Sequence, residues 1–396
     1  MRLSRAERSL LTDWWFTVDR VLLTAVLALA GAGAILSLAA GPAAALKRGL
    51  PPLYFVERHL AFTALAVLVM LAVSILDPPR MRRLALVVLL ISFALMAVIL
   101  VAGPEINGAR RWLRIAGHSL QPSEFAKPAF VLLSAWLLGE SERRRDVPAT
   151  SFALGLLLLF AGMLVLQPDI GQTLLIFLVW GTLFFLSGQP MLRAFALALV
   201  GAAGLVAAYF TFPHVHQRIG RFLAPGSGDT FQVDRALQSI VEGGFFGRGP
   251  GEGIVKTVLP DAHTDFILSV IAEEYGVLAC LAVLGLFAFI ALRALGRARA
   301  ESDPFLRLAT AGLALLIAFQ ALINMGVTVG LLPAKGMTLP LISMGGSSTL
   351  AIGLTLGLLI GVTRRRVDPE RLKKPTFMPH PMLIQTPGRI SESAPQ

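Results

Sequence analysis

A polar turn at 259–267 (Leu-Pro-Asp-Ala-His-Thr-Asp-Phe-Ile) holds the side chain best suited to chemistry in this chain. Asp265 stands there, directly before a predicted helix and at the start of an apolar segment. A carboxylate at a lipid–water boundary can act as a general base that takes the proton of a hydroxyl group within hydrogen-bond reach. Thr264 or Asp265 could instead be the N-cap of the helix, which typically contributes about 1 kcal/mol. Spacing alone leaves both interpretations open.

A second cluster combines an acid and a base three residues apart. Glu124 and Lys127 fall on one face of a predicted helix, where they can pair. The pair could simply allow a helix to begin near the membrane interface. Alternatively it lines a cavity, because ionisable groups inside spanning segments are rare and usually functional. Arg110, Arg111 and Arg114 precede the pair, and a guanidinium group can bind phosphate oxygens through two parallel hydrogen bonds.

Two further clusters are weaker signals. Within 167–172 (Gln-Pro-Asp-Ile-Gly-Gln), Asp169 precedes a predicted helix and is typical of an ordinary N-cap. The glycine-rich run 243–253 could bind phosphate through backbone amides, or it could be a flexible turn. It lacks the spacing of a nucleotide-binding P-loop, so no nucleotide is expected. The chain has a single cysteine, Cys280, which excludes an internal disulfide and a CxxC site.

Membrane-spanning helices must position these clusters. Hydrophobic residues make up 55% of the 396 residues and charged residues 15%, against roughly a quarter charged in ordinary globular domains. A segment at 121–139 is interrupted only by Glu124 and Lys127. Nine other segments contain no Asp, Glu, Lys or Arg, and each approaches or exceeds the roughly 20 residues that cross a bilayer: 21–46, 59–76, 84–104, 147–168, 170–192, 194–217, 275–292, 308–334 and 336–363.

Backbone polar groups in hydrocarbon need partners within their own segment, which favours helices. The sequence therefore predicts an all-α polytopic membrane protein with about ten transmembrane helices. A long outer loop, 211–264, is predicted between helices seven and eight. We further expect a cytoplasmic tail at 1–20, a ten-helix membrane domain at 21–366 and a disordered cytoplasmic tail at 367–396.

Arginine placement predicts the orientation. With the N-terminus inside, every predicted inner segment is basic, as the positive-inside rule requires. The formal charge of +11 therefore marks topology and contact with anionic lipid, not nucleic acid. Both termini are expected in the cytoplasm. Lys47, Arg48 and Arg58 fall on the predicted outer side, and the rule gives no reason for them.

The motifs together resemble the SEDS family (shape, elongation, division and sporulation), and they are closest to its division branch. The elements that carry the resemblance recur in order over about 20–366. One departure is Met344, where the family usually has an aromatic residue. The elements are NGARRW at 107–112, QPSEFAK at 121–127, QPDIGQ at 167–172, GFFGRGPGEG at 244–253, LPDAHTDF at 259–266 and LPAKGMTLPLISMGGSS at 332–348.

The resemblance implies a peptidoglycan glycosyltransferase that polymerises lipid II, an undecaprenyl-pyrophosphate disaccharide-pentapeptide, during septal wall synthesis. In this chemistry an acceptor sugar hydroxyl attacks the anomeric carbon of the growing chain and the lipid pyrophosphate leaves. The resemblance makes Asp265 the catalytic carboxylate. It also gives functional weight to Glu124, Lys127 and Lys335. Arg111, whose positive charge could stabilise the pyrophosphate, and Ser347 complete the set of substrate-binding candidates.

The same resemblance implies a setting in the bacterial inner membrane, at the division septum. The expected partners are a class B penicillin-binding protein and divisome membrane proteins. A divalent cation, Mg or Mn, could assist departure of the pyrophosphate. Two alternatives stay open at this point: a lipid II flippase, which buried ionisable residues would suit, and a non-catalytic division scaffold.

Overall fold

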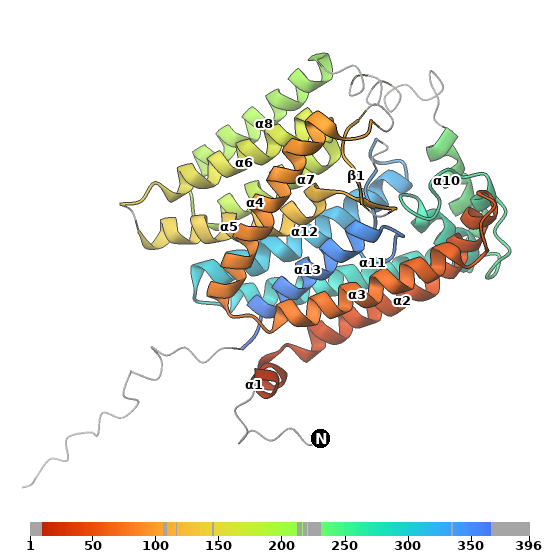
Figure 1. The fold of residues 1–396 in the computed structure, drawn as a ribbon, viewed down its shortest axis with the longest axis horizontal. Coiled ribbons are helices and arrows are strands. Elements are labelled where there is room, and N and C mark those ends of the chain that lie inside the picture. The colour runs from red at the N-terminus through yellow and green to blue at the C-terminus, as the bar shows by residue number, and fades with distance from the viewer. Residues whose placement is uncertain are drawn as a thin grey trace, which may run out of the picture. The chain divides into compact units, whose positions relative to one another are not determined.

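Helices dominate the computed structural model, which describes residues 10–105, 109–115, 117–144, 146–211, 216, 220, 231–333 and 336–365 (Figure 1). Within these residues, one helix corresponds to each of the ten predicted spans. The ten are α2 (Arg20–Leu46), α3 (Tyr54–Ser74), α4 (Pro78–Ala102), α5 (Pro122–Arg143), α6 (Ala149–Leu166), α7 (Ile170–Leu186), α8 (Met191–Thr211), α11 (Ile267–Arg299), α12 (Pro304–Thr328) and α13 (Gly346–Val362).

Length and apolarity divide these helices into two groups. Seven of them, α2, α3, α4, α6, α8, α11 and α12, are long and apolar enough to cross a membrane. Helices α7 and α13 are apolar but have 17 residues each, and α5 contains Glu124 and Lys127. The predicted fold class, an all-α multi-pass membrane protein, is confirmed.

The centre of the bundle is formed by α5, α12 and α13 (Figure 1). Helix α13 is buried over almost its whole length and packs along α3. Two glycines explain the close approach. A Cβ atom on Gly353 would lie 2.5 Å from the Ala66 carbonyl oxygen, and one on Gly357 would lie 2.8 Å from that of Met70. Small residues at such spacing let two helix backbones touch within a membrane.

Helix α11 begins earlier than the apolar pattern predicts. The expected span was 275–292, whereas the helix runs from Ile267 to Arg299 with a break at Gly276 (φ 83°, ψ 173°). The apolar pattern does not predict the first part of this helix, because Glu273 and Glu274 interrupt the apolar run. Both carboxylates are buried, under the described part of the 211–264 loop.

The described part of the 211–264 loop is fixed by contacts with α11. It contains α10 (Phe231–Gly243) and a 3₁₀ turn, η1 (Val255–Thr257). The Glu273 carboxylate accepts hydrogen bonds from the backbone N–H groups of 254, 255 and 256 at 2.6, 2.7 and 3.0 Å. It also accepts one from the Ser239 hydroxyl at 3.0 Å, while Glu274 pairs with Lys256. One pair of acidic residues thus fixes both α10 and η1 on α11.

The glycines that join α10 to this loop have a packing role. A Cβ on Gly243 would fall 1.9 Å from the Ala272 carbonyl oxygen, and one on Gly247 would fall 2.2 Å from that of Glu274. Gly247 also has φ 81°, which other residues rarely adopt. These two glycines therefore lie against α11 and do not form an open phosphate cradle.

Three smaller features complete the fold. Helix α1 (Leu10–Thr17) lies in the predicted N-terminal tail. A short antiparallel hairpin, β1 (Leu113–Ile115) and β2 (His118–Leu120), leads directly into α5. The compact unit ends at Arg364, and the predicted C-terminal tail at 367–396 lies outside the described residues.

Candidate functional site

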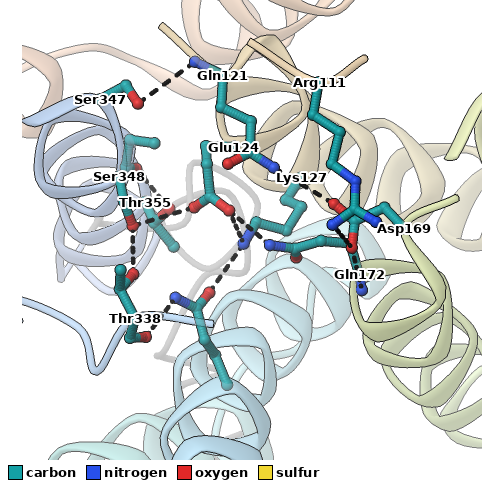
Figure 2. A network of polar contacts seen from close by, with 12 residues as sticks. Arg111, Gln121, Glu124, Lys127, Asp169, Gln172, Thr338, Ser347, Ser348 and Thr355 are labelled. Carbon is teal, nitrogen blue, oxygen red and sulfur yellow. Dashed lines mark hydrogen bonds and ion pairs between the residues drawn. The ribbon is translucent and has the colours of Figure 1, made fainter. Parts of the chain in front are cut away.

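A buried ion pair near the start of α5 forms the centre of a polar network (Figure 2). The Lys127 Nζ atom lies 3.0 Å from Oε1 of Glu124, one helical turn earlier. Glu124 is 3% exposed and Lys127 is 2% exposed. The exposures exclude a solvated surface pair, so the predicted pair exists and belongs to the interior.

Side chains from three other helices complete the hydrogen bonding of this pair. Gln172 of α7 donates to Glu124 Oε1 at 2.6 Å, and Ser348 of α13 donates to Oε2 at 3.2 Å. Lys127 donates to Oε1 of Gln320, on α12, at 3.0 Å. Buried charges are tolerated when they are paired and hydrogen-bonded. We call Glu124, Lys127, Gln172, Gln320 and Ser348 the α5 network.

Arg111 and Asp169 extend this network towards the turn between α6 and α7 (Figure 2). Arg111 donates to the backbone carbonyls of Gln167, at 2.8 Å, and Pro168. Its Nη1 atom also lies 3.7 Å from Asp169. Asp169 accepts from the backbone N–H of Gln172 and is the N-cap of α7, as predicted. Burial raises the pKa of Asp169, and the Arg111 charge opposes that rise.

Ser347 connects the hairpin to α13. Its hydroxyl accepts the backbone N–H of Gln121 at 3.3 Å, just before α5 begins. The Gln121 side chain in turn donates to Asp169 at 3.3 Å. Ser347 is therefore adjacent to the α5 network, although it does not touch Glu124 in any described contact.

Asp265 is not a helix cap. The N-cap of α11 is Phe266, without any side-chain cap hydrogen bond, and the Thr264 hydroxyl donates to the Asp261 carbonyl at 3.2 Å. The N-cap interpretation is therefore wrong, because the helix starts one residue later than a cap at 265 requires. Among the described residues, none donates a hydrogen bond to the Asp265 carboxylate. Burial, with a contribution from the Asp261 charge, raises the pKa of Asp265 to about 7.

Backbone contacts hold the Asp265 turn in place. The Asn324 side-chain amide donates to the carbonyls of Asp265, at 2.8 Å, and Met337, at 2.6 Å. Ser343 donates to the Thr264 carbonyl at 2.6 Å. The backbone N–H of Met344 donates to His263 at 3.0 Å. Because this last contact uses backbone atoms, the unusual methionine at 344 leaves it intact.

The 336–348 segment connects the Asp265 turn with the α5 network. A Cβ on Gly336 would lie 3.4 Å from Oδ2 of Asp265, whereas Ser348 reaches Glu124. Gln320 and Asn324, four residues apart on α12, each bind a carbonyl of the segment, those of Thr338 and Met337. The sequence analysis did not single out Gln320 and Asn324. The signal that could have found them is two side-chain amides four residues apart in a charge-free span.

For two of the predicted features, Lys335 and the divalent cation, the described residues provide no site geometry. Lys335 lies outside the described residues. Within the described part of the chain, no group of three His, Cys, Asp or Glu side chains could hold a metal ion. Magnesium often takes only one or two protein carboxylates and completes its shell with water and substrate phosphate, and Asp265 with Asp261 offers at most that.

Comparisons with known proteins identify what the chain resembles. The sequence model of one family, described as cell cycle proteins and named for FtsW, RodA and SpoVE, matches residues 20–367. A probable peptidoglycan glycosyltransferase FtsW from Caulobacter vibrioides (strain NA1000 / CB15N) is 45% identical over 364 residues, or 92% of this chain and 93% of the relative. A protein of the same name from Halorhodospira halophila is 37% identical, over 90% and 93%.

Solved structures share the fold as well. One comes from work on the structural coordination of polymerization and crosslinking by a peptidoglycan synthase complex. It matches with a TM-score of 0.71 and 31% identity, over 87% of this chain and 97% of that one. The rod shape determining protein RodA of Thermus thermophilus matches with a TM-score of 0.64 and 30% identity, over 88% and 97%.

Proposed function

This chain belongs to the SEDS family of cell cycle proteins, on its FtsW branch, and we propose that it is a peptidoglycan glycosyltransferase that polymerises lipid II during septal wall synthesis. The names of its relatives support the activity. The assignment of the site rests on the surroundings of Asp265. Its backbone carbonyl is bound by Asn324, and its carboxylate accepts no hydrogen bond from the described residues.

In the proposed reaction, Asp265 accepts the proton of the acceptor sugar 4-hydroxyl. The hydroxyl oxygen forms a bond to the anomeric carbon of the growing chain, and the bond from that carbon to the lipid pyrophosphate breaks. A base is most effective when its pKa lies near the working pH, and the pKa of Asp265, about 7, meets that condition. The lipid-linked donor supplies the energy, so no nucleotide is needed.

The substrate-binding candidates that the structure describes differ in how deeply they are buried. Glu124 and Lys127 neutralise each other and are buried, so we assign them to holding α5, α7, α12 and α13 in position around the site. Ser347 has a similar role at the hairpin. Arg111, with 18% of its side chain exposed, and Lys335 are the candidates for stabilising charge on the departing pyrophosphate.

A divalent cation, Mg or Mn, would be held by Asp265 and would neutralise pyrophosphate charge. Asp265 would then be less able to accept a proton, because a coordinated carboxylate is a weaker base. For this reason the steps above use only side chains of the chain itself.

The cellular setting follows from the same relationship. The chain is a multi-pass membrane protein, and we place it in the inner membrane at the septum with both termini in the cytoplasm. A class B penicillin-binding protein is the proposed partner, supported by the match to a peptidoglycan synthase complex. Divisome membrane proteins complete the proposed assembly.

One assay tests this function against its rivals. The purified chain, with a class B penicillin-binding protein, is given lipid II, and glycan products are followed on a gel while lipid translocation is followed in vesicles. We expect polymer. Translocation without polymer would favour the flippase, to which the buried α5 pair gives some support. The absence of both would leave a scaffold.

A further inference from the structure

A cavity of about 110 Å³ lies beside the Asp265 turn, and the reaction above makes no use of it. Its walls include Arg58, His59 and Phe62 of α3, His263 of the turn, and Gly345 and Gly346 at the start of α13. Pockets for drug-sized ligands measure roughly 300–1,000 Å³. This cavity therefore has room for one small group and not for a sugar.

His59 is a buried polar side chain in the wall of this cavity. It is 3% exposed, and the Leu341 backbone lies beside its ring. Neither ring nitrogen has a hydrogen-bond partner of normal geometry. Because a buried donor without a hydrogen bond of normal geometry destabilises the fold, a site that keeps one is a candidate for binding a ligand that supplies the missing contact.

Arg58 brings a positive charge to the same place. It is half-buried and its guanidinium lies over the Phe62 ring, 5.8 Å from the centroid. Among the described residues, no carboxylate lies within 4.0 Å of it. Arg58 is also one of the cations on the predicted outer side whose position the positive-inside rule does not explain.

The start of α13 adds backbone donors. Its N-cap, Gly345, provides no side chain to bind the first amides of the helix. Helix N-termini favour anions, because these amides and the helix dipole both point at the ligand. A Cβ on Gly346 would lie 3.0 Å from the Phe62 ring, so a larger residue would crowd the wall of the cavity at this terminus.

We propose that this cavity is an anion subsite that takes one phosphate group of a polyprenyl-linked phosphate or pyrophosphate. Arg58 supplies charge, His59 and His263 supply hydrogen-bond donors, and α13 supplies amides. Burial, together with the Arg48 charge, lowers the pKa of His263 to about 4, so its ring is neutral at pH 7 and carries one N–H. The lipid identity of the ligand rests on the proposed function, whereas the anion chemistry rests on the cavity itself.

The test measures binding without turnover. The full chain in nanodiscs is titrated with inorganic pyrophosphate by calorimetry. Arg58→Gln should weaken binding about 10- to 100-fold, since it removes charge-assisted hydrogen bonds, and Arg58→Lys should lose less. Lys47→Gln is the matched control, because Lys47 is an exposed outer-side cation outside the cavity, and it should bind within about twofold of wild type.

A second arm uses native mass spectrometry of the same nanodiscs loaded with undecaprenyl phosphate. Binding of the lipid alone, weakened by Arg58→Gln, would show that the subsite recognises a phosphate only when it is attached to a chain. If Arg58→Gln does not fold, His59→Gln replaces it, with an expected loss of about tenfold.

Wild-type affinity in both variants, or no binding of either probe by wild type, would overturn the subsite. Asp265→Asn should bind pyrophosphate as wild type does. A chain that binds the anion but makes no polymer would therefore count against the proposed function and not against the subsite.

Discussion

Glu124 and Asp265 are two carboxylates that lie against the same 336–348 segment, yet their surroundings are opposite. Glu124 accepts hydrogen bonds from Lys127, Gln172 and Ser348. The Asp265 carboxylate accepts none from the described residues, and only its backbone carbonyl is bound, by Asn324. A buried carboxylate with several hydrogen-bond donors is held in one geometry, whereas an unpaired carboxylate with a raised pKa is suited to proton transfer. The difference separates residues that shape the site from the residue that reacts.

The largest effect is expected from Asp265→Asn. If Asp265 is the base, its loss should lower the rate of polymerisation by about 10²–10⁴. The fold should not suffer, because the folded-state pKa of Asp265 lies above the unfolded value of about 3.9. Ionisation above that value therefore opposes folding, and removing the charge should leave the melting temperature at pH 7.5 equal or slightly higher.

Polymer formation by the folded variant with its partner, together with its melting curve, checks this result. Substantial polymer from Asp265→Asn would end the assignment. Asp261→Asn is the control, since Asp261 is exposed and has φ 52°, which asparagine tolerates; it should stay active.

Lys127→Ala should lower the stability of the fold, unlike Asp265→Asn, which should not lower it. It leaves the Glu124 charge buried without its ion partner, which should lower the free energy of unfolding by about 3–5 kcal/mol. Chemical denaturation of the detergent-solubilised protein measures the loss. A variant as stable as wild type would mean that the pair is solvated in solution and that the α5 network does not shape the site.

The pH dependence of the rate is the next test. With a base of pKa about 7, the rate should fall about tenfold for each pH unit below 7 and level off above it. Because the Asp261 charge helps to raise the pKa of Asp265, Asp261→Asn should shift the midpoint to lower pH. A flat profile between pH 5.5 and 8 would contradict the role of Asp265.

Arg307→Ala should have the smallest effect on stability of these variants. Arg307 pairs with Glu142 at 2.8 Å, and its side chain is 35% exposed. Solvent screens such pairs, so the loss in unfolding free energy should be about 0–1 kcal/mol. A loss as large as that of Lys127→Ala would remove the distinction between buried and exposed pairs on which the comparison depends.

The sequence by itself determined the bundle and the position of the candidate base. Long charge-free runs predict spanning helices because hydrocarbon tolerates no unpaired backbone groups, and each predicted span has its helix. The turn with Asp265 and the spacing of Glu124 and Lys127 were also visible, since local spacing fixes which side chains share a face.

Only the tertiary structure decided what these residues do. Lys127 binds Gln320, 193 positions away, and Asn324 binds the turn at Asp265 and the chain at Met337. It also decided that Asp265 caps no helix, and that Arg58 and His59 share a cavity with the start of α13. Such contacts depend on how whole helices pack, and the pattern of residues along one helix does not contain that information.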